Sequence, residues 1–324
     1  MKFLKMTAAL LLAGSALLTS AVAETVRVAS TKTGTVNWEL RAIVEHGLDR
    51  QAGIELEILE LADIGATRMA VQQGAADVAV ADWMWVSRMR DEGHPFSFTP
   101  YSSSVGGLMV HPDSGIRTLK DLEGRKLGVV GGALSKGWLL LQALSEQEGV
   151  NLSSVEKVFG APPLLSKELQ ARRVDAVITY WHFAAKLEAA GMQRLMELSE
   201  VAPRLGIEEQ VPMLGYIFME DWAKTRPDAV NGLIQASRSA KEFLATHPEA
   251  WNSLRPKMGA KNDAEFEQLK RGYLEGSPQP LTAAGVREAK TLFRIMGKIG
   301  GKKLIGDSTK LAEGTFWGVA EGES

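Results

Sequence analysis

The stretch that decides the fold is DVAVADW at residues 77–83, because it recurs 98 residues downstream as DAVITYW at residues 175–181. Each copy places a short apolar run directly after an aspartate, and each follows a segment that carries a glutamine, Gln72 or Gln170. Apolar runs of this length between turn residues are typical of buried strands. The repeat therefore predicts two related halves, each built around such a strand.

The residues around both copies alternate between strand and helix patterns. Strands are predicted at 26–29, 55–59, 78–81 and 126–130, and helices at 38–50, 66–73 and 136–148. Strands separated by helices favour an α/β fold with largely parallel sheets. Chance similarity is the alternative for one pair of strands, but Trp38 and Trp138 also match. Beyond Gly215 the pattern turns helical, at 227–246, 248–254, 263–274 and 282–298, and we expect these helices to pack on the first half.

The amino terminus has the pattern of a secretion signal. Lys2 and Lys5 precede an apolar run at 6–18, and Ala-Val-Ala at 21–23 fits a cleavage site. The run is shorter than the roughly 20 residues that span a membrane. We therefore expect a signal peptide at 1–23 and a periplasmic mature protein. The chain has no cysteine, which excludes disulfides, thiol nucleophiles and lipid attachment through cysteine.

Charge and composition exclude other classes of partner. The net charge is −2 with a pI of about 6.3, and both signs are interspersed. There is no basic field that would hold nucleic acid. Of the glycine-rich segments, 131–137 lacks the spacing of a phosphate loop or a dinucleotide fingerprint. We expect no nucleic-acid partner, no cofactor and no metal.

Ligands of open α/β sheets bind where strands end and helices begin. Five segments meet that condition or adjoin it, at 31–38, 82–85, 101–104, 131–137 and 179–182. They carry hydroxyl, charged and aromatic side chains. The candidate ligand-binding residues are Thr33, Thr35, Asn37, Trp38, Asp82, Trp83, Trp85, Ser103, Ser104, Ser135, Lys136, Tyr180, Trp181 and His182.

Several of these residues have a structural alternative. Thr35, Asn37 and Asp82 could cap helices instead of contacting a ligand. Alternating side chains cannot both face a ligand, so either Trp83 or Trp85 is expected in the core. Lys136 could be an ordinary solvated residue of a first helical turn, and His182 a hydrogen-bonding residue at a helix start. Asp82 would repel an anionic ligand unless it is protonated or turned away, whereas it could pair with an amine.

Three longer segments carry a family resemblance. QQGAADVAVADW at 72–83, TLKDLEGRKLGVVGG at 118–132 and RRVDAVITYW at 172–181 occur together and in this order. The chain thereby resembles the substrate-binding proteins of nitrate, sulfonate and taurine import systems and the related pyrimidine-precursor binders. The resemblance implies a type II periplasmic binding fold with two lobes joined by two crossover segments. Lobe 1 is predicted at 24–103 plus 217–324, and lobe 2 at 104–216.

The resemblance also implies a function, a partner and an alternative function. The function is capture of a small organic or anionic solute, sulfonate-, taurine- or nitrate-like, by a monomer that delivers it to an ABC-transporter permease in the inner membrane. The alternative is a thiamine-related pyrimidine-precursor binder or a THI5-like enzyme on the same fold. No metalloprotease motif or nucleophile elbow is found, and only five histidines occur. We therefore predict no catalytic residues and a binding protein.

Overall fold

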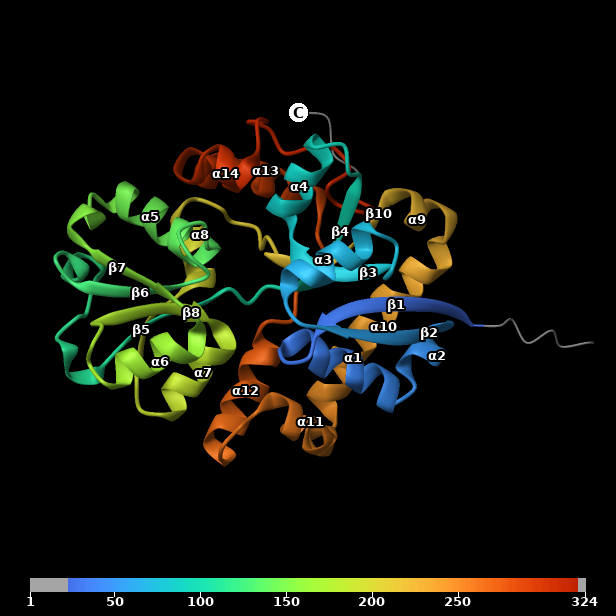
Figure 1. Cartoon of the computed structure of the whole chain (residues 1–324), viewed down its shortest axis with the longest axis horizontal. Helices are drawn as coiled ribbons and strands as arrows, with labels where there is room; N and C mark the ends of the chain where they lie inside the picture. Colours follow the sequence, from blue (N-terminus) through green and yellow to red (C-terminus); the bar gives the residue numbers. More distant parts are fainter. Residues whose placement is uncertain (1–22, 320–324) are drawn as a thin grey trace, which may run out of the picture.

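The computed structural model describes residues 23–319, which form two α/β lobes side by side (Figure 1). Residues 1–22 of the predicted signal peptide lie outside the described residues. Each lobe is built on its own five-stranded mixed sheet. The predicted fold class, an α/β protein with two lobes and mixed sheets, is confirmed.

Lobe 1 has the strand order β2-β1-β3-β10-β4. β1 pairs in parallel with β2 and β3, and β10 pairs antiparallel with β3 and β4. The strands are β1 (Glu24–Thr31), β2 (Ile54–Leu61), β3 (Val78–Asp82), β4 (Phe96–Ser102) and β10 (Leu214–Met219). The helices between them are α1 (Thr35–Glu45), α2 (Leu48–Gln51), α3 (Ile64–Gln72) and α4 (Trp83–Asp91).

Lobe 2 repeats this plan with the order β7-β6-β8-β5-β9. β6 is parallel to β7 and β8, and β5 is antiparallel to β8 and β9. The strands are β5 (Gly106–Val110), β6 (Lys126–Val130), β7 (Glu156–Gly160), β8 (Ala176–Tyr180) and β9 (Gln193–Glu197). The helices are α5 (Lys136–Glu148), α6 (Pro162–Gln170), α7 (Trp181–Ala189) and α8 (Val201–Arg204). Single 3₁₀ turns lie at Pro112–Ser114, Leu119–Leu122, Leu152–Ser154, Leu198–Glu200 and Pro248–Ala250.

The repeated segments occupy equivalent places. β3 and β8 are the central strands of their sheets, and each leads directly into a helix, α4 or α7. Lobe 2 therefore presents the same strand-end geometry as lobe 1. The predicted internal repeat thus corresponds to a repeat in structure.

Two crossover segments join the lobes. The first runs from the end of β4 to the start of β5, where Gly106 has a φ of 149° and a β-carbon would lie 2.0 Å from the Thr179 carbonyl oxygen. Only glycine fits so close to that strand. The second segment returns ahead of β10, which pairs along its whole length with lobe 1. The chain thus re-enters lobe 1 at residue 214, ahead of the boundary predicted between 216 and 217.

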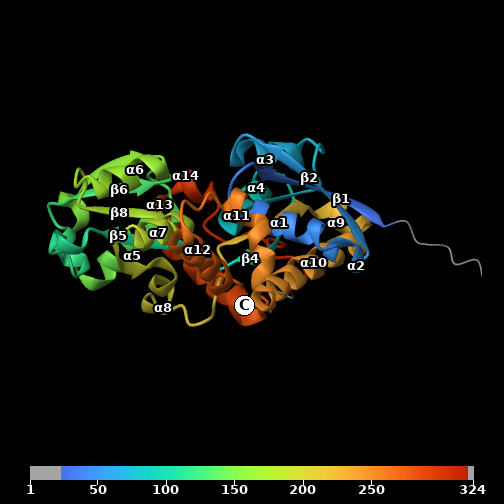
Figure 2. The ribbon, with the colours of Figure 1, turned by 90° about the horizontal axis from the view of Figure 1, so that it is seen from below.

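The carboxy-terminal helices extend from lobe 1 across to lobe 2 (Figures 1 and 2). They are α9 (Glu220–Thr225), α10 (Pro227–Thr246), α11 (Trp251–Met258), α12 (Asp263–Glu275), α13 (Ala283–Gly300) and α14 (Lys302–Ile305). α10 packs on α1 within lobe 1, as expected. α12 also packs against α7, and α13 against α5, so these helices contact both lobes.

A buried carboxylate fixes α12 to lobe 1. Glu39 of α1 has no exposed surface and accepts hydrogen bonds from Tyr216 (2.8 Å), Ser237 (2.5 Å) and Tyr273, and it pairs with Lys241 (2.5 Å). A buried charge is tolerated when it is paired and hydrogen-bonded in this way. Tyr273 belongs to α12, so the network holds that helix in the position from which it reaches lobe 2.

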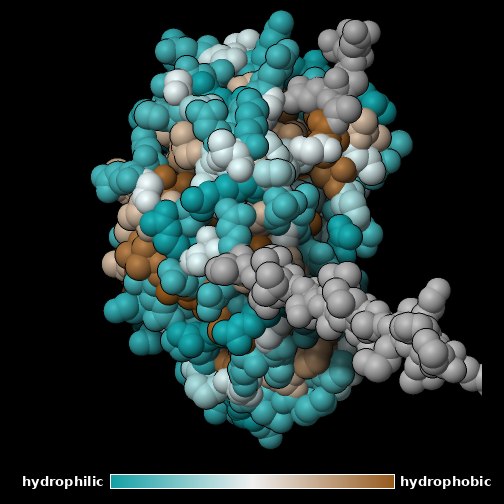
Figure 3. All heavy atoms as spheres, turned by 90° about the vertical axis from the view of Figure 1, so that its right-hand side faces the viewer, coloured by the Kyte–Doolittle hydropathy of each residue, from teal (hydrophilic) through white to brown (hydrophobic). Residues whose placement is uncertain are grey.

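The outer surface of lobe 1 is polar. On the face that Figure 3 shows, hydrophilic residues predominate and hydrophobic ones form separate small patches. Among residues 23–319, no helix has the length and apolar character that crossing a membrane requires.

Candidate functional site

Four helices begin at the junction between the lobes. α1 and α4 follow the ends of β1 and β3 in lobe 1, and α5 and α7 follow the ends of β6 and β8 in lobe 2. By the repeat, α1 corresponds to α5 and α4 to α7. The helices meet crosswise, because α4 contacts α5 through a charged pair and α1 contacts α7 through two tryptophans. The strand-end segments singled out in the sequence therefore converge.

The first contact is ionic. The Asp82 carboxylate, at the amino end of α4, lies 2.9 Å from Lys136 Nζ at the start of α5 and 3.5 Å from Arg68 of α3. It also accepts a hydrogen bond from the Trp85 backbone N–H (2.9 Å), so it caps α4 as well. The Arg68 guanidinium lies 4.7 Å from the centre of the Trp85 ring. We call Arg68, Asp82 and Lys136 the charged triad.

The charged triad explains how the site could accept an anion although it contains Asp82. Burial opposes ionisation of Asp82, but Lys136 and Arg68 together outweigh it and hold the pKa of this carboxyl below its ordinary value. The group is therefore ionised and turned toward two cations. One positive charge remains in excess at the start of α5, where the helix dipole also favours negative charge.

The second contact is aromatic. Trp38 of α1 and Trp181 of α7 meet edge to face, with ring centroids 6.0 Å apart and an interplanar angle of 83°. Trp38 is 2% exposed and Trp181 8%. The indole N–H of Trp38 donates to the Lys257 carbonyl oxygen at 3.2 Å, and Trp181 packs against Gly272 of α12. Both predicted tryptophans thus join the lobes.

Next to these contacts, Tyr180 is the candidate aromatic with the most open surface. Tyr180 is 40% exposed, and its hydroxyl lies beside Gly131, where an added β-carbon would come within 3.0 Å of the hydroxyl oxygen. The His182 ring stacks on Tyr180 at a centroid distance of 6.2 Å. Burial, together with Lys186, lowers the pKa of His182 to about 4, so the imidazole is neutral at pH 7.

Some candidates have partners within one lobe. Trp83 has no exposed surface and packs between Phe293 and Phe316, so it is the core tryptophan of its pair. The Asn37 side chain is buried, donates to Glu60 (3.0 Å) and accepts from Arg41 (2.8 Å).

The remaining hydroxyl candidates lie nearer the junction. Ser135 caps α5 by accepting from the Trp138 N–H at 3.4 Å. Thr33 is exposed, and Thr35 is half-buried at the first residue of α1. Ligand contact for these residues stays a prediction.

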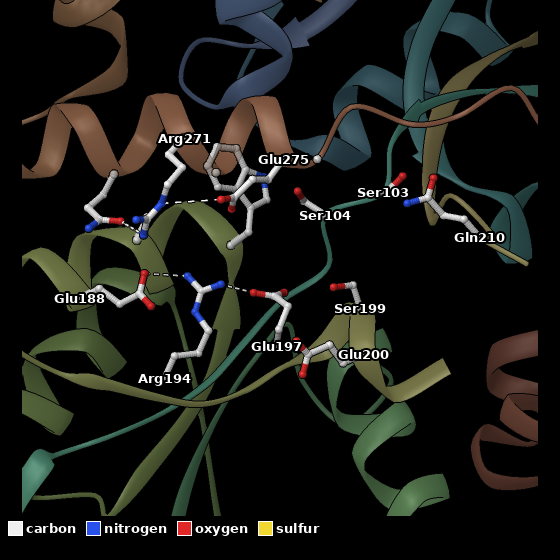
Figure 4. Close-up of a pocket in the computed structure, with 15 residues that line it drawn as sticks. Ser103, Ser104, Glu188, Arg194, Glu197, Ser199, Glu200, Gln210, Arg271 and Glu275 are labelled. Carbon is white, nitrogen blue, oxygen red and sulfur yellow. Dashed lines mark hydrogen bonds and ion pairs between the residues drawn. The ribbon is translucent and has the colours of Figure 1, made fainter. Parts of the chain in front are cut away.

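A cavity of about 360 Å³ lies at the crossover side of the junction (Figure 4). Three candidate residues line it, namely Ser103, Ser104 and Trp181. Sequence reasoning missed the charged side chains around them: Glu188, Arg194, Glu197, Glu200, Arg271 and Glu275. Arg194 pairs with Glu188 at 2.8 Å and also with Glu197. These residues come from α7, β9, the 3₁₀ turn Leu198–Glu200 and α12, and no local pattern links them.

The described part of the chain holds no group of three or more histidine, cysteine or carboxylate residues placed to bind a metal ion. The side chains that meet at the junction are charged, hydroxyl and aromatic, a set that suits recognition of a small polar solute.

The two lobes, their crossovers and the converging helix starts define a type II periplasmic-binding-protein fold. The sequence profile described as NMT1/THI5 like matches residues 44–251, which is more than half of the chain. The chain belongs to the NMT1/THI5-like family.

Individual proteins show the same likeness. Over 97 residues the chain is 37% identical to the probable ABC transporter extracellular-binding protein YckB of Bacillus subtilis (strain 168), a match covering 25% of this chain and 33% of that protein. The chain thus spans about a third of the length of this curated relative. The periplasmic aliphatic sulphonate binding protein SsuA from Escherichia coli superposes with a TM-score of 0.72 at 16% identity, covering 93% of this chain and 94% of the other. The desulfurization enzyme DSZB shares the fold, with a TM-score of 0.57, 16% identity and coverage of 90% and 97%.

Proposed function

We propose that this protein is the solute-binding component of an ABC-type importer, exported to the periplasm and acting as a monomer. It captures one small solute between its lobes and presents the closed form to a permease in the inner membrane. The observation that carries the proposal is the crosswise convergence of four helix starts from two lobes, joined by the Asp82–Lys136 pair and the Trp38–Trp181 contact. Closure of lobes about a hinge is the usual way in which such folds trap a ligand.

For the solute we propose an organic anion of the sulfonate or taurine type, or a nitrate-like ion. The excess positive charge of the triad and the start of α5 would hold the anionic group. The Tyr180 ring, with its open surface, would cover the organic part. The likeness to an aliphatic sulphonate binding protein supports the same class of solute.

The test is a thermal-shift panel on the mature protein with alkyl sulfonates, taurine, nitrate, bicarbonate, aromatic amines and pyrimidines. A ligand that binds only the folded state raises its stability by RT ln(1 + [L]/Kd). We expect one anionic class to raise the melting temperature, and Lys136→Ala and Tyr180→Ala to reduce that shift. Lys120→Ala, which removes an exposed lysine outside the junction, is the matched control and should leave it unchanged.

The second candidate is the pyrimidine-precursor binder or THI5-like enzyme. Two observations support this alternative: the family description includes THI5, and a desulfurization enzyme has the same fold. A shift with pyrimidines alone would select the binder. If no compound raises the melting temperature and an added metabolite is turned over, the protein is the enzyme, and the transport function is contradicted.

A further inference from the structure

The cavity at the crossover side differs from the strand-end junction in both walls and charge. Its walls are α7, β9 and the 3₁₀ turn Leu198–Glu200 of lobe 2, α12 of lobe 1 and the crossover segments. The crossover segments contribute Ser103, Ser104 and Gln210. β9 is the edge strand of its sheet, three strands away from β6, which leads to the charged triad. Its volume of about 360 Å³ is large enough for a small organic molecule.

The charge of the lining is negative. Four glutamates (Glu188, Glu197, Glu200 and Glu275) face two arginines, which leaves a formal excess of two negative charges. Arg194 is held between Glu188 and Glu197, and Arg271 lies 3.7 Å from Glu275, so both arginines are already paired (Figure 4). An anion would meet uncompensated carboxylates here, whereas a cation would be attracted.

A buried hydroxyl without a partner points to the same site. Ser103 lines the cavity, is 8% exposed, and its Oγ has no hydrogen-bond partner among the described residues. A buried polar group without a partner is unfavourable, so a ligand that hydrogen-bonds with Ser103 Oγ relieves that cost. Its neighbours Ser104 and Gln210 offer further donors and acceptors. Trp181 and Ala185 supply the apolar part of the wall.

We propose that this cavity is a second binding site, for a small organic cation that also carries a hydroxyl group, such as an amino alcohol. The ammonium group would lie by Glu197 and Glu200, and the hydroxyl would bond with Ser103. Because both lobes form the walls, the cation would bind the closed form and favour it over the open one. This site goes beyond the proposed transport function and takes a ligand of opposite charge.

The test is calorimetric titration of the full mature protein with ethanolammonium chloride at constant ionic strength. We expect saturable binding, weaker binding of ethylammonium, and no binding of ethanesulfonate at this site. The charge-removing double variant Glu197→Gln/Glu200→Gln should weaken ethanolammonium binding at least tenfold. The matched control Glu242→Gln/Glu249→Gln, with both glutamates exposed and outside the cavity, should leave it unchanged.

Two further variants distinguish a failure of this second site from a failure of the proposed transport site. Ser103→Ala should abolish the preference for ethanolammonium over ethylammonium, a readout that does not depend on the double variant folding. Lys136→Ala should reduce binding of the transported anion without affecting ethanolammonium, which keeps the two sites distinguishable. Absence of saturable binding, equal binding by the control and charge-removing variants, or a preference that survives Ser103→Ala would overturn the proposal.

Discussion

The two contacts between helix starts of the two lobes occupy equivalent positions but differ in chemistry. Where α4 meets α5, Asp82 pairs with Lys136, and where α1 meets α7, Trp38 packs on Trp181. The sequence repeat aligns Asp82 with Tyr180, which directly precedes Trp181, so the position that carries a carboxylate at the first contact carries a phenol beside the second. The difference indicates that one contact sets the charge preference of the junction and the other its apolar stability. The following variants separate these roles, from the largest expected effect to the smallest.

Trp181→Ala should have the largest effect on stability. It removes a side chain that is 8% exposed and packed against both Trp38 and Gly272. Truncation of a buried tryptophan to alanine typically costs about 3–5 kcal/mol. Urea unfolding should show this loss. An unchanged unfolding midpoint would mean that the aromatic contact does not join the lobes in solution.

Asp82→Ala should cost about 2–4 kcal/mol, because it leaves Lys136 and Arg68 without their shared carboxylate and removes the cap of α4. Lys136→Ala should cost less, since Asp82 keeps Arg68. The same urea titration, with the Lys136→Ala/Asp82→Ala double variant, gives the coupling energy. If the two single losses simply add, the pair across the lobes is not formed.

His182 predicts a pH dependence on the aromatic side. Its pKa of about 4 lies below the ordinary value of 6.5, so the unfolded chain binds a proton that the folded protein does not. Stability is therefore unaffected by this group above pH 6.5 and falls as the pH drops toward 4, by at most about 3.5 kcal/mol at about 1.4 kcal/mol per pKa unit. Unfolding between pH 4 and 7 should depend less on pH in His182→Gln. Identical profiles would contradict a neutral, half-buried imidazole.

Tyr180→Ala should leave stability within about 0.5 kcal/mol, because the residue is 40% exposed. It is therefore the matched control for Trp181→Ala. Its effect should instead appear in solute affinity, as a loss of at least tenfold in calorimetry, with Tyr180→Phe retaining most of the binding. Equal affinity of the wild type and Tyr180→Ala would place the solute away from this ring.

Part of the strands and helices of both lobes could be predicted, because hydrophobic runs and turn residues are local signals. The helix predicted at 136–148 matches α5, for example. Which of Trp83 and Trp85 enters the core could not be predicted, since Trp83 is buried by Phe293 of α13 and by Phe316, both more than 200 residues away in the sequence.

The candidate site was predicted in part for the same reason. The rule that ligands bind at strand ends selected Asp82, Lys136, Trp38 and Trp181, which do meet. Their crosswise pairing depends on how the lobes pack, which no local pattern encodes. The cavity beside the crossovers was missed because Glu188, Arg194 and Glu275 come from three separate elements.

The most direct test of closure on a solute is a distance measurement between the lobes. The chain has no cysteine, so spin labels can be placed at Met69→Cys in α3 of lobe 1 and Leu164→Cys in α6 of lobe 2, both at exposed positions. Pulsed electron-spin resonance would compare the free protein with the protein saturated by the solute that the thermal-shift panel selects. We predict a broad distance distribution in the free protein that narrows to a single shorter distance when the solute binds. The same distribution with and without solute would contradict capture by closure of the two lobes.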